Sequence, residues 1–177
     1  MGIHHQGSHG IHIDDIIKIL HGHIRNDYTF NPVGAITHED SMYNRNPSLK
    51  DKIHCLVSVL PANKISIMDN EVKRQMIEVR MKARDVGLPQ AVILTMVDKA
   101  CPLVKANLEK IYTSRKIKEK VKECSQKLGV PESCIYPLKN YHKEDATGTK
   151  MDILILNALI NIINFANDYV DDHANNE

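Results

Sequence analysis

The alternation of short apolar runs with longer amphipathic segments after Lys52 limits the fold of this chain more than any other feature. Three short apolar runs stand out, at Ile53 to Leu60, Ala91 to Val97 and Cys134 to Leu138. The first two are apolar at nearly every position, which is typical of strands buried on both faces of a parallel sheet. Pro137 cannot donate a backbone hydrogen bond, so we expect the third strand at a sheet edge.

Helical periodicity fills the segments between these runs. Residues 68 to 86 place apolar side chains at steps of three and four positions, with charged side chains between them, which predicts an amphipathic helix. Gly87 and Pro89 are expected to end this helix, since glycine tolerates a left-handed turn and proline cannot continue a helix. The same pattern recurs from Ile117 to Leu128. The whole pattern predicts parallel βαβ units with helices on both faces of the sheet.

The last predicted helix runs from about Lys150 to Val170. Thr149 and Asp152 have the spacing of a capping box, in which each side chain bonds to the backbone amide of the other residue. The most apolar window, Ile153 to Ala166, is interrupted by three asparagines and is shorter than the ~20 apolar residues that a membrane span needs. We therefore expect a buried helix here and no membrane span.

The part of the chain before Lys52 carries weaker signals. Residues 14 to 24 have the pattern of a short helix, and residues 25 to 51 look like a long loop, a feature that is usually functional or disordered. We divide the chain into a His-rich flexible N-terminus at residues 1–13, an α/β domain at 14–172 and a polar tail at 173–177. The histidines at the start lack carboxylate or thiolate partners, so no ordered metal site is predicted; they are His4, His5, His9 and His12.

Charge and cysteine content exclude several classes of protein. The 177 residues include 23 Lys or Arg and 22 Asp or Glu, a net charge of +1, which argues against dedicated nucleic-acid binding. Basic residues concentrate between 103 and 128, and we interpret them as a solvated helix face, with a weak contact to anionic lipid or RNA as the alternative. The four cysteines show no disulfide framework, and no signal-peptide pattern precedes them, so we expect a cytoplasmic, reduced protein.

An aspartate follows the second predicted strand, in the sequence Thr95-Met96-Val97-Asp98. Guanine-binding domains carry an Asn-Lys-x-Asp motif at such a strand end, where the carboxylate accepts two hydrogen bonds from guanine. An aspartate at a strand end is also common as a helix cap or a solvated loop residue. The residues alone leave both interpretations open.

From Asp14 to about Asp172 the chain resembles the C-terminal part of the interferon-induced protein 44 family, which includes a close 44-like relative. Several segments carry the resemblance: DDIIKILHGHI at 14 to 24 with Tyr28-x-Phe30-Asn31-Pro32, NPSLKDKIHCLVSV at 46 to 59, LTMVD at 94 to 98, KLGV at 127 to 130, and MDILILNAL at 151 to 159. The resemblance implies a G-domain-like fold with a phosphate loop, induction by interferon in antiviral responses, and a mainly cytoplasmic location.

The same resemblance implies a vestigial guanine site. Asp98 matches the base-reading aspartate of the family and Thr95 its opening threonine, while Met96 replaces a basic residue whose stem would cover the ring. Asn140, followed by Tyr141, matches the family's Asn-Tyr in the loop after the last strand. An ordinary strand-to-helix loop is an equally good interpretation of that segment.

The largest departure from the family is the missing phosphate loop, because no G-x-x-x-x-G-K-[ST] motif occurs among the eight glycines. Met1-Gly2 resembles the end of the family's metal-side Asp-x-x-Gly motif, as though the chain began just past it. We therefore expect an incomplete, three-layer P-loop-NTPase-like unit with no catalytic residues, no metal and no resident cofactor, and at most weak binding of GTP or GDP.

The sequence thus predicts a non-catalytic, interferon-induced immune-response protein that acts as a cytoplasmic interaction module. The alternative is a guanine-nucleotide-binding, GTPase-like protein of which this chain is a C-terminal fragment. In a G-domain the strand at Ile53 to Leu60 would lie beside a strand that is missing here. Its open edge carries no Lys, Glu or Pro, so we expect a partner or a second copy to pair there. The edge residues are Ile53, Cys55, Val57 and Val59.

Overall fold

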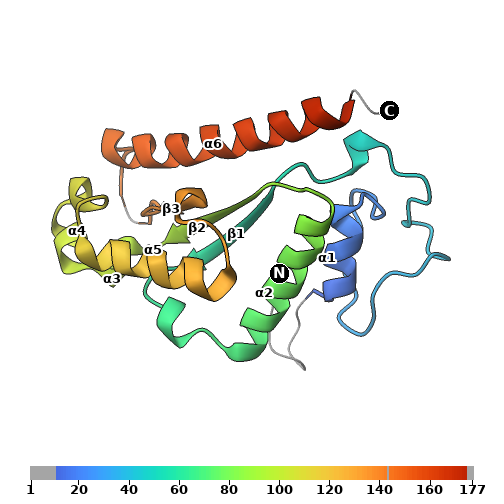
Figure 1. Ribbon diagram of the computed structural model, residues 1–177, viewed down its shortest axis with the longest axis horizontal. Coiled ribbons are helices and arrows are strands. Elements are labelled where there is room, and N and C mark those ends of the chain that lie inside the picture. Colours follow the sequence, from blue (N-terminus) through green and yellow to red (C-terminus); the bar gives the residue numbers. More distant parts are fainter. Residues whose placement is uncertain (1–10, 143, 175–177) are drawn as a thin grey trace. The chain divides into compact units, whose positions relative to one another are not determined.

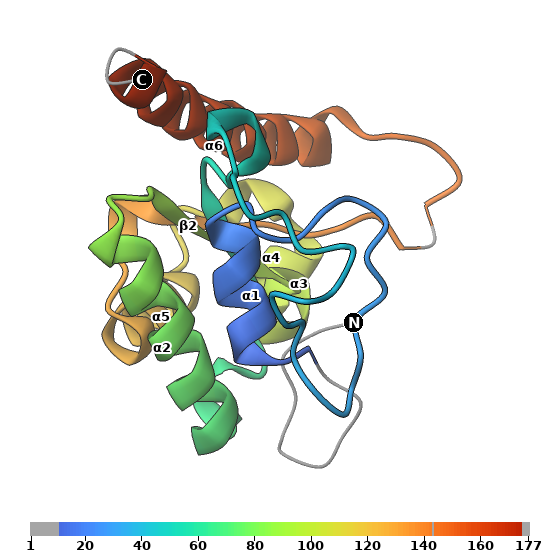
Figure 2. The same ribbon diagram turned by 90° about the vertical axis from the view of Figure 1, so that its right-hand side faces the viewer.

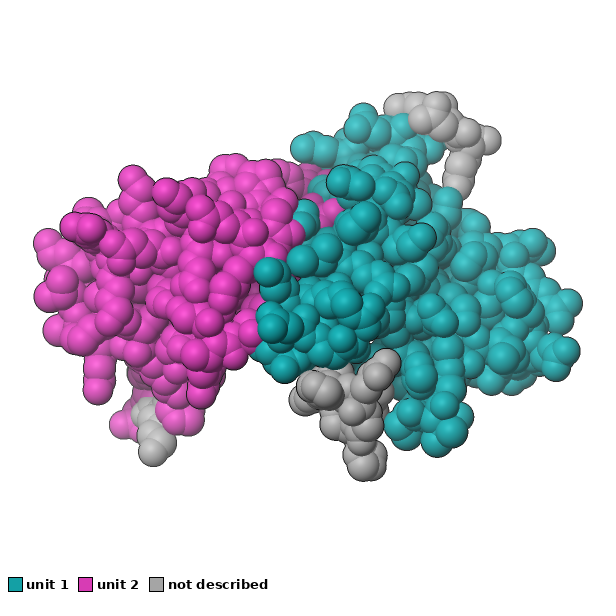
Figure 3. Space-filling model, turned by 60° about the horizontal axis from the view of Figure 1, so that its bottom comes forward, with its two compact units in different colours: residues 1–56, 69–89, 166–177 teal, residues 57–68, 90–165 magenta. Residues whose placement is uncertain are grey.

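The computed structural model describes residues 11–142 and 144–174. Its helices and strands form two compact units, coloured separately in Figure 3. Unit 1 comprises residues 1–56, 69–89 and 166–177, and unit 2 comprises residues 57–68 and 90–165. Three of the four N-terminal histidines for which no metal site was predicted, His4, His5 and His9, lie outside the described residues, as does most of the predicted flexible N-terminus.

Unit 1 is built around two helices, α1 (Ile13–Leu20) and α2 (Asn70–Asp85), which lie side by side in Figures 1 and 2. Asp69 caps α2 by accepting hydrogen bonds from the amides of Glu71 and Val72, a contact that commonly stabilises a helix by about 1 kcal/mol. The helices enclose an apolar cluster, whose buried members are Leu20, Val79, Ala83, Leu88 and Tyr169. The predicted helix at 68 to 86 is confirmed, and Gly87 ends it with a φ of +70°.

The long loop of unit 1 is tied to α1. Asp15 is fully buried and accepts a hydrogen bond from the amide of Ile36 at 2.8 Å, while Lys18 donates to the carbonyl of Ile36 at 2.5 Å. Farther along the loop, Ile24 and Tyr43 form an isolated antiparallel bridge. The loop is therefore held by buried polar contacts that its composition did not reveal, and it ends in a single 3-10 turn at Leu49–Asp51.

Unit 2 contains the sheet, whose strands are β1 (Leu56–Pro61), β2 (Gln90–Thr95) and β3 (Ile135–Pro137) in the order β1-β2-β3. The β2 and β3 strands are parallel, with Val92 opposite Ile135. At the two ends of β1, the amide of Leu56 donates to Pro89 and that of Ala62 donates to Thr95. Moving from the first bond to the second advances by six residues along both segments in the same direction, so β1 also runs parallel to β2.

Helices lie on both sides of the strands of unit 2. Figure 1 shows α5 on one side and α6 on the other. The helices of this part are α3 (Val97–Ala100), α4 (Pro102–Ala106), α5 (Arg115–Leu128) and α6 (Thr149–Ala174), of which the residues from 166 on belong to unit 1. The 3-10 turns are Ile65–Ile67, Leu108–Lys110 and Glu132–Cys134. The predicted α/β class with a three-stranded parallel sheet and flanking helices is confirmed.

The first predicted strand is shifted in the structure. It begins at Leu56 rather than at Ile53, because Ile53 packs against the apolar cluster of unit 1. The prediction that β1 is buried on both faces was also wrong. Leu60 is buried, but Val59, which alternates to the other face of the sheet, is 60% exposed, so that face of β1 is only partly covered. Of the predicted edge residues, only Val57 and Val59 belong to β1, and the strand ends at Pro61.

Two further predictions at element ends are corrected. The second strand stops at Thr95 instead of Val97, because Met96 adopts a left-handed conformation with a φ of +57° and α3 begins at Val97. No capping box forms at α6: Thr149 is already helical, and the carboxylate of Asp152 accepts a hydrogen bond from the hydroxyl of Tyr141 at 2.7 Å. The third strand lies at a sheet edge, as Pro137 predicted.

The α6 helix is longer and more exposed than expected. It has 26 residues, and among the described parts of the chain it alone is long and apolar enough to cross a membrane by length and composition. Its most apolar window has a mean hydropathy of 1.4 and is only 11% buried. The expected burial of this helix was therefore wrong over most of its length, and the absence of a membrane span stays a prediction.

Candidate functional site

Two of the three predicted guanine-site residues line one small cavity in unit 2. Thr95 reaches it from the end of β2, and Asn140 from the loop after β3. The cavity has a volume of about 190 Å³ and lies between the strands and α6; its other lining residues are Val59, Ile93, Leu138, Ile155, Ala158 and Leu159. Small-molecule sites commonly enclose about 300–1,000 Å³, so this cavity is smaller than a site for a nucleotide.

The hydroxyl of Thr95 is already occupied by a contact within the sheet. It donates a hydrogen bond to the carbonyl of Leu60 at 3.2 Å, and the residue is only 7% exposed. The contact joins the ends of β1 and β2. Thr95 therefore has a clear role in holding the strands together.

The third predicted residue, Asp98, does not line this cavity. It lies in the first turn of the short helix α3, two residues beyond the left-handed Met96, whose side chain is 40% exposed. A carboxylate in the first turn of a helix is the helix-end interpretation that the residues had left open. The structure thus brings Thr95 and Asn140 together and leaves Asp98 apart from them.

A second cavity of about 450 Å³ opens beside the start of α6. Three lysines line it, and two of them are paired: Lys139 with Glu144 at 2.5 Å and Lys150 with Glu109 at 2.9 Å. The remaining lining residues are Val104, Lys105, Leu108, Gly148, Thr149 and Met151. The ion pairs reduce the attraction of this cavity for an anion.

Tyr141 closes the loop between β3 and α6. Its hydroxyl accepts a hydrogen bond from the amide of Gly148 at 2.5 Å and donates one to Asp152 at 2.7 Å. The bond to Asp152 raises the pKa of Tyr141, because it favours the protonated hydroxyl. Of the predicted Asn-Tyr pair, Tyr141 therefore holds the loop in place, whereas Asn140 is exposed.

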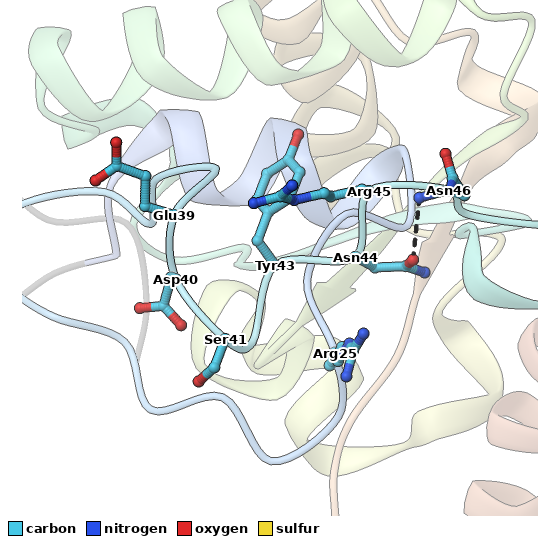
Figure 4. Close-up of a pocket in the computed structure, with 8 residues that line it drawn as sticks. All are labelled: Arg25, Glu39, Asp40, Ser41, Tyr43, Asn44, Arg45 and Asn46. Atoms are coloured by element: carbon cyan, nitrogen blue, oxygen red, sulfur yellow. Dashed lines mark hydrogen bonds between the residues drawn. The ribbon is translucent and has the colours of Figure 1, made fainter.

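Unit 1 has a polar cavity of about 350 Å³ in its long loop (Figure 4). Arg25 lines it from one side and residues 39–46 from the other. Several of its polar side chains form hydrogen bonds within the loop itself. Asp40 accepts one from the amide of Met42, Asn44 accepts one from the amide of Asn46, and Arg45 donates one to the carbonyl of His38. A neighbouring cavity of about 440 Å³ shares Arg25, Asn44 and Asn46 with it. Sequence reasoning missed both cavities, because they depend on how the loop folds back on itself.

Nucleophile and metal chemistry have little support in the described part of the chain. Cys101 is 2% exposed, and its thiol lies 3.3 Å from the hydroxyl of Ser114. This hydrogen bond lowers the pKa of Cys101, yet burial keeps the thiol from a substrate. Among residues 11–142 and 144–174, no group of three or more His, Cys, Asp or Glu side chains could hold a metal ion.

Sequence comparison then identifies relatives. The chain is 33% identical to human interferon-induced protein 44 over 163 residues, 31% identical to human interferon-induced protein 44-like over 172 residues, and 31% identical to the mouse interferon-induced protein 44 over 163 residues. These alignments cover 92% to 97% of the chain. Nearly the whole chain is therefore homologous to a part of interferon-induced protein 44 and of its 44-like relative.

The chain corresponds to only part of each relative. The chain spans between 37% and 39% of their length. No protein-family model matches the chain, and no solved structure matches it. The resemblance predicted from the segments at 14–24, 46–59 and 94–98 is thus confirmed by sequence, whereas a G-domain-like fold is not confirmed by any structural neighbour.

Proposed function

We propose that this chain is a non-catalytic protein of the interferon response that acts in the cytoplasm as an interaction module. In this proposal its α/β unit is an incomplete G-domain-like fold without a phosphate loop. The family relationship supports the interferon response, because the relatives are named as interferon-induced proteins. The absence of a phosphate-loop motif from the sequence supports a non-catalytic role.

The observation that carries the proposal is the outer edge of β1. The backbone groups of Leu56 and Ala62 bond towards β2, so alternation along the strand turns those of Val57 and Val59 outward. No strand in the described part of the chain pairs with this side. An edge of this kind, with Val59 60% exposed, can receive an extended segment of another protein or of a second copy of this chain.

The test is to place a charge on this edge. Val59→Lys should lower the average mass of the full chain measured by light scattering at tens of micromolar, because lysine discourages strand addition. Ile67→Lys is the matched control, since Ile67 is 70% exposed and lies in a 3-10 turn away from the edge. An unchanged mass for Val59→Lys, or a wild-type chain that is a monodisperse monomer at this concentration, would contradict the proposal.

The alternative is a guanine-nucleotide-binding, GTPase-like protein of which this chain is a part. The shared cavity of Thr95 and Asn140 favours it, because the end of β2 and the loop after β3 are the two places where the family resemblance implies a guanine site. The small volume of that cavity and the separate position of Asp98 favour the interaction module instead.

A further inference from the structure

The outward face of α6 is the largest apolar feature of unit 2 that no described contact explains. Five large side chains along it are between 44% and 60% exposed: Ile153, Leu156, Leu159, Ile160 and Ile163. Leu159 stands at the margin of this face, since it also lines the cavity between the strands and α6. We name these five residues the α6 stripe. The opposite face of the helix contains Met151 and Ala158, which are 8% and 1% exposed. The helix is thus apolar on two faces, only one of which is buried within the protein.

The spacing of the α6 stripe is that of a helix-pairing seam. Ile153, Leu156, Ile160 and Ile163 follow steps of three, four and three, which are the a and d positions of a heptad repeat. Asn167 takes the next a position, where a polar residue commonly fixes the register of paired helices. A second helix with the same spacing is therefore the surface that complements the stripe.

The charges along α6 select a second copy in antiparallel orientation. Lys150, which pairs with Glu109 in its own chain and is still 64% exposed, stands at the start of the helix, and acidic residues gather near its end, at Asp168, Asp171 and Asp172. Parallel copies would place these acidic ends together. Antiparallel copies place the Lys150 end of each helix near the acidic end of the other, and they also oppose the helix dipoles favourably.

The same charges argue against a membrane surface as the occupant. Helices that lie on membranes carry Lys or Arg on their polar face, which attracts anionic lipids. Between Met151 and Ala174 the α6 helix has no Lys or Arg and has four aspartates. Asn157 and Asn164 flank the stripe with neutral amides, which suit the margin of a protein interface.

We propose that the α6 stripe is a homodimer interface, in which Leu156 of one copy packs against Ile160 of the second copy and the two helices run antiparallel. The proposal goes beyond the β1 edge and does not depend on it. From Ile153 to Ile163 the seam extends about 15 Å. So short a seam belongs to the small, transient class of interfaces, which bury less than about 1,200 Å², so we expect a weak, reversible dimer.

The experiment uses the full chain carrying Val59→Lys, so that association through the β1 edge is removed. Sedimentation velocity should show a dimer at about 50 μM in this background, and adding Ile160→Glu or Leu156→Lys should give monomers. Adding Leu103→Glu is the matched control, because Leu103 is 69% exposed in α4 and outside the stripe. This control should leave the dimer intact.

Mixing the two stripe variants decides between a second copy and any other occupant. In an antiparallel pair, Lys at position 156 of one chain meets Glu at position 160 of the other, so an equimolar mixture should recover dimers that neither variant forms alone. A monomeric Val59→Lys chain, or a mixture that stays monomeric, would overturn the proposal. Flotation of the chain with vesicles of phosphatidylcholine and phosphatidylserine, lost in Leu156→Lys, would overturn it in favour of a membrane surface. Because Val59→Lys is measured first on its own, failure of the β1-edge proposal is seen separately.

Discussion

At the scale of single residues, Asp15 has the most demanding environment in the described part of the chain. Its side chain is 0% exposed, one oxygen bonds to the amide of Ile36, and the other oxygen has no hydrogen-bond partner within the described residues. Buried carboxylates of this kind are tolerated because they satisfy a backbone group that would otherwise be buried without a bond. Asp15 therefore anchors the long loop on α1.

Asp15→Ala should lower the free energy of unfolding by about 1–3 kcal/mol, since the amide of Ile36 would be left buried and unsatisfied. Asp15→Asn should lose less, because an amide oxygen can accept the same bond. Asp14→Ala is the matched control: Asp14 is exposed in the same helical turn and its loss should change stability by less than about 0.5 kcal/mol. Urea denaturation measures all three, and equal effects at positions 14 and 15 would contradict this role.

The conformation of a residue was predictable where the residue's own preference determines it, and was not where a contact distant in sequence determines it. Gly87 and Gly129 end helices with φ values of +70° and +73°, and both were readable because glycine alone favours that conformation. Met96 adopts a φ of +57° against its own preference, imposed by the turn into α3, and no local signal announces it. The role of Asp152 was missed for a similar reason, since its partner Tyr141 is eleven residues away.

At the scale of elements, a charged cluster joins the 3-10 turn at Ile65–Ile67 to α5. Glu123 pairs with Lys120 at 3.0 Å and Lys127 at 3.2 Å and accepts a hydrogen bond from Ser66 at 2.9 Å. Lys127 also donates to the carbonyl of Ile65 at 2.7 Å. Part of the basic region between 103 and 128, predicted to be a solvated face, thus has a structural role.

Glu123→Gln should lower the free energy of unfolding by about 1 kcal/mol at pH 7, because two partly buried ion pairs are lost. Desolvation raises the pKa of Glu123, but the bonds from Lys120, Ser66 and Lys127 outweigh it, and the net pKa is lowered from 4.5. The stabilisation is therefore complete above pH 4.5 and is lost as the pH falls through the pKa of the folded state.

The pH dependence of stability tests whether the charge of Glu123 is the cause of this effect. The difference between wild type and Glu123→Gln should shrink as urea denaturation is repeated from pH 7 down to pH 3, since uncharged urea does not screen the ion pairs. Glu119→Gln should have a small effect throughout, because Glu119 is 61% exposed and pairs with Arg115, which is 93% exposed. A Glu123→Gln difference that stays constant down to pH 3 would show that charge is not its cause.

The position of a helix or strand was predictable where its own periodicity of apolar residues identifies it. The amphipathic periods of α2 and α5 identify both helices, because each helix buries one stripe whatever its neighbour is. The rule for a doubly buried strand failed at β1, since it assumes a strand on each side and a cover on each face. The apolar face of α6 was misread as core for the same reason: residues such as Ile153 and Leu156 are equally apolar whether they face the interior or another molecule.

At the scale of the whole molecule, two compact units combine segments that are far apart in the sequence, such as 1–56 with 69–89. Sequence patterns predict elements and their order, but this grouping depends on tertiary contacts. The predicted boundaries after residues 13 and 172 stay predictions. The candidate site was only partly predictable: Thr95 and Asn140, chosen by the motif match, line one cavity and Asp98 does not, and the guanine site itself stays a prediction.

The central claim is that this relative of interferon-induced protein 44 works by interaction and not by nucleotide chemistry. Loop amides and the lysine of a phosphate loop normally supply much of the affinity for a triphosphate, and the sequence has no such motif. The direct test is a titration of the full chain and of Asp98→Ala with a fluorescent GTP analogue. We predict only weak binding in the millimolar range, equal in the two proteins, whereas a dissociation constant at or below the micromolar range that is lost in Asp98→Ala would contradict the claim.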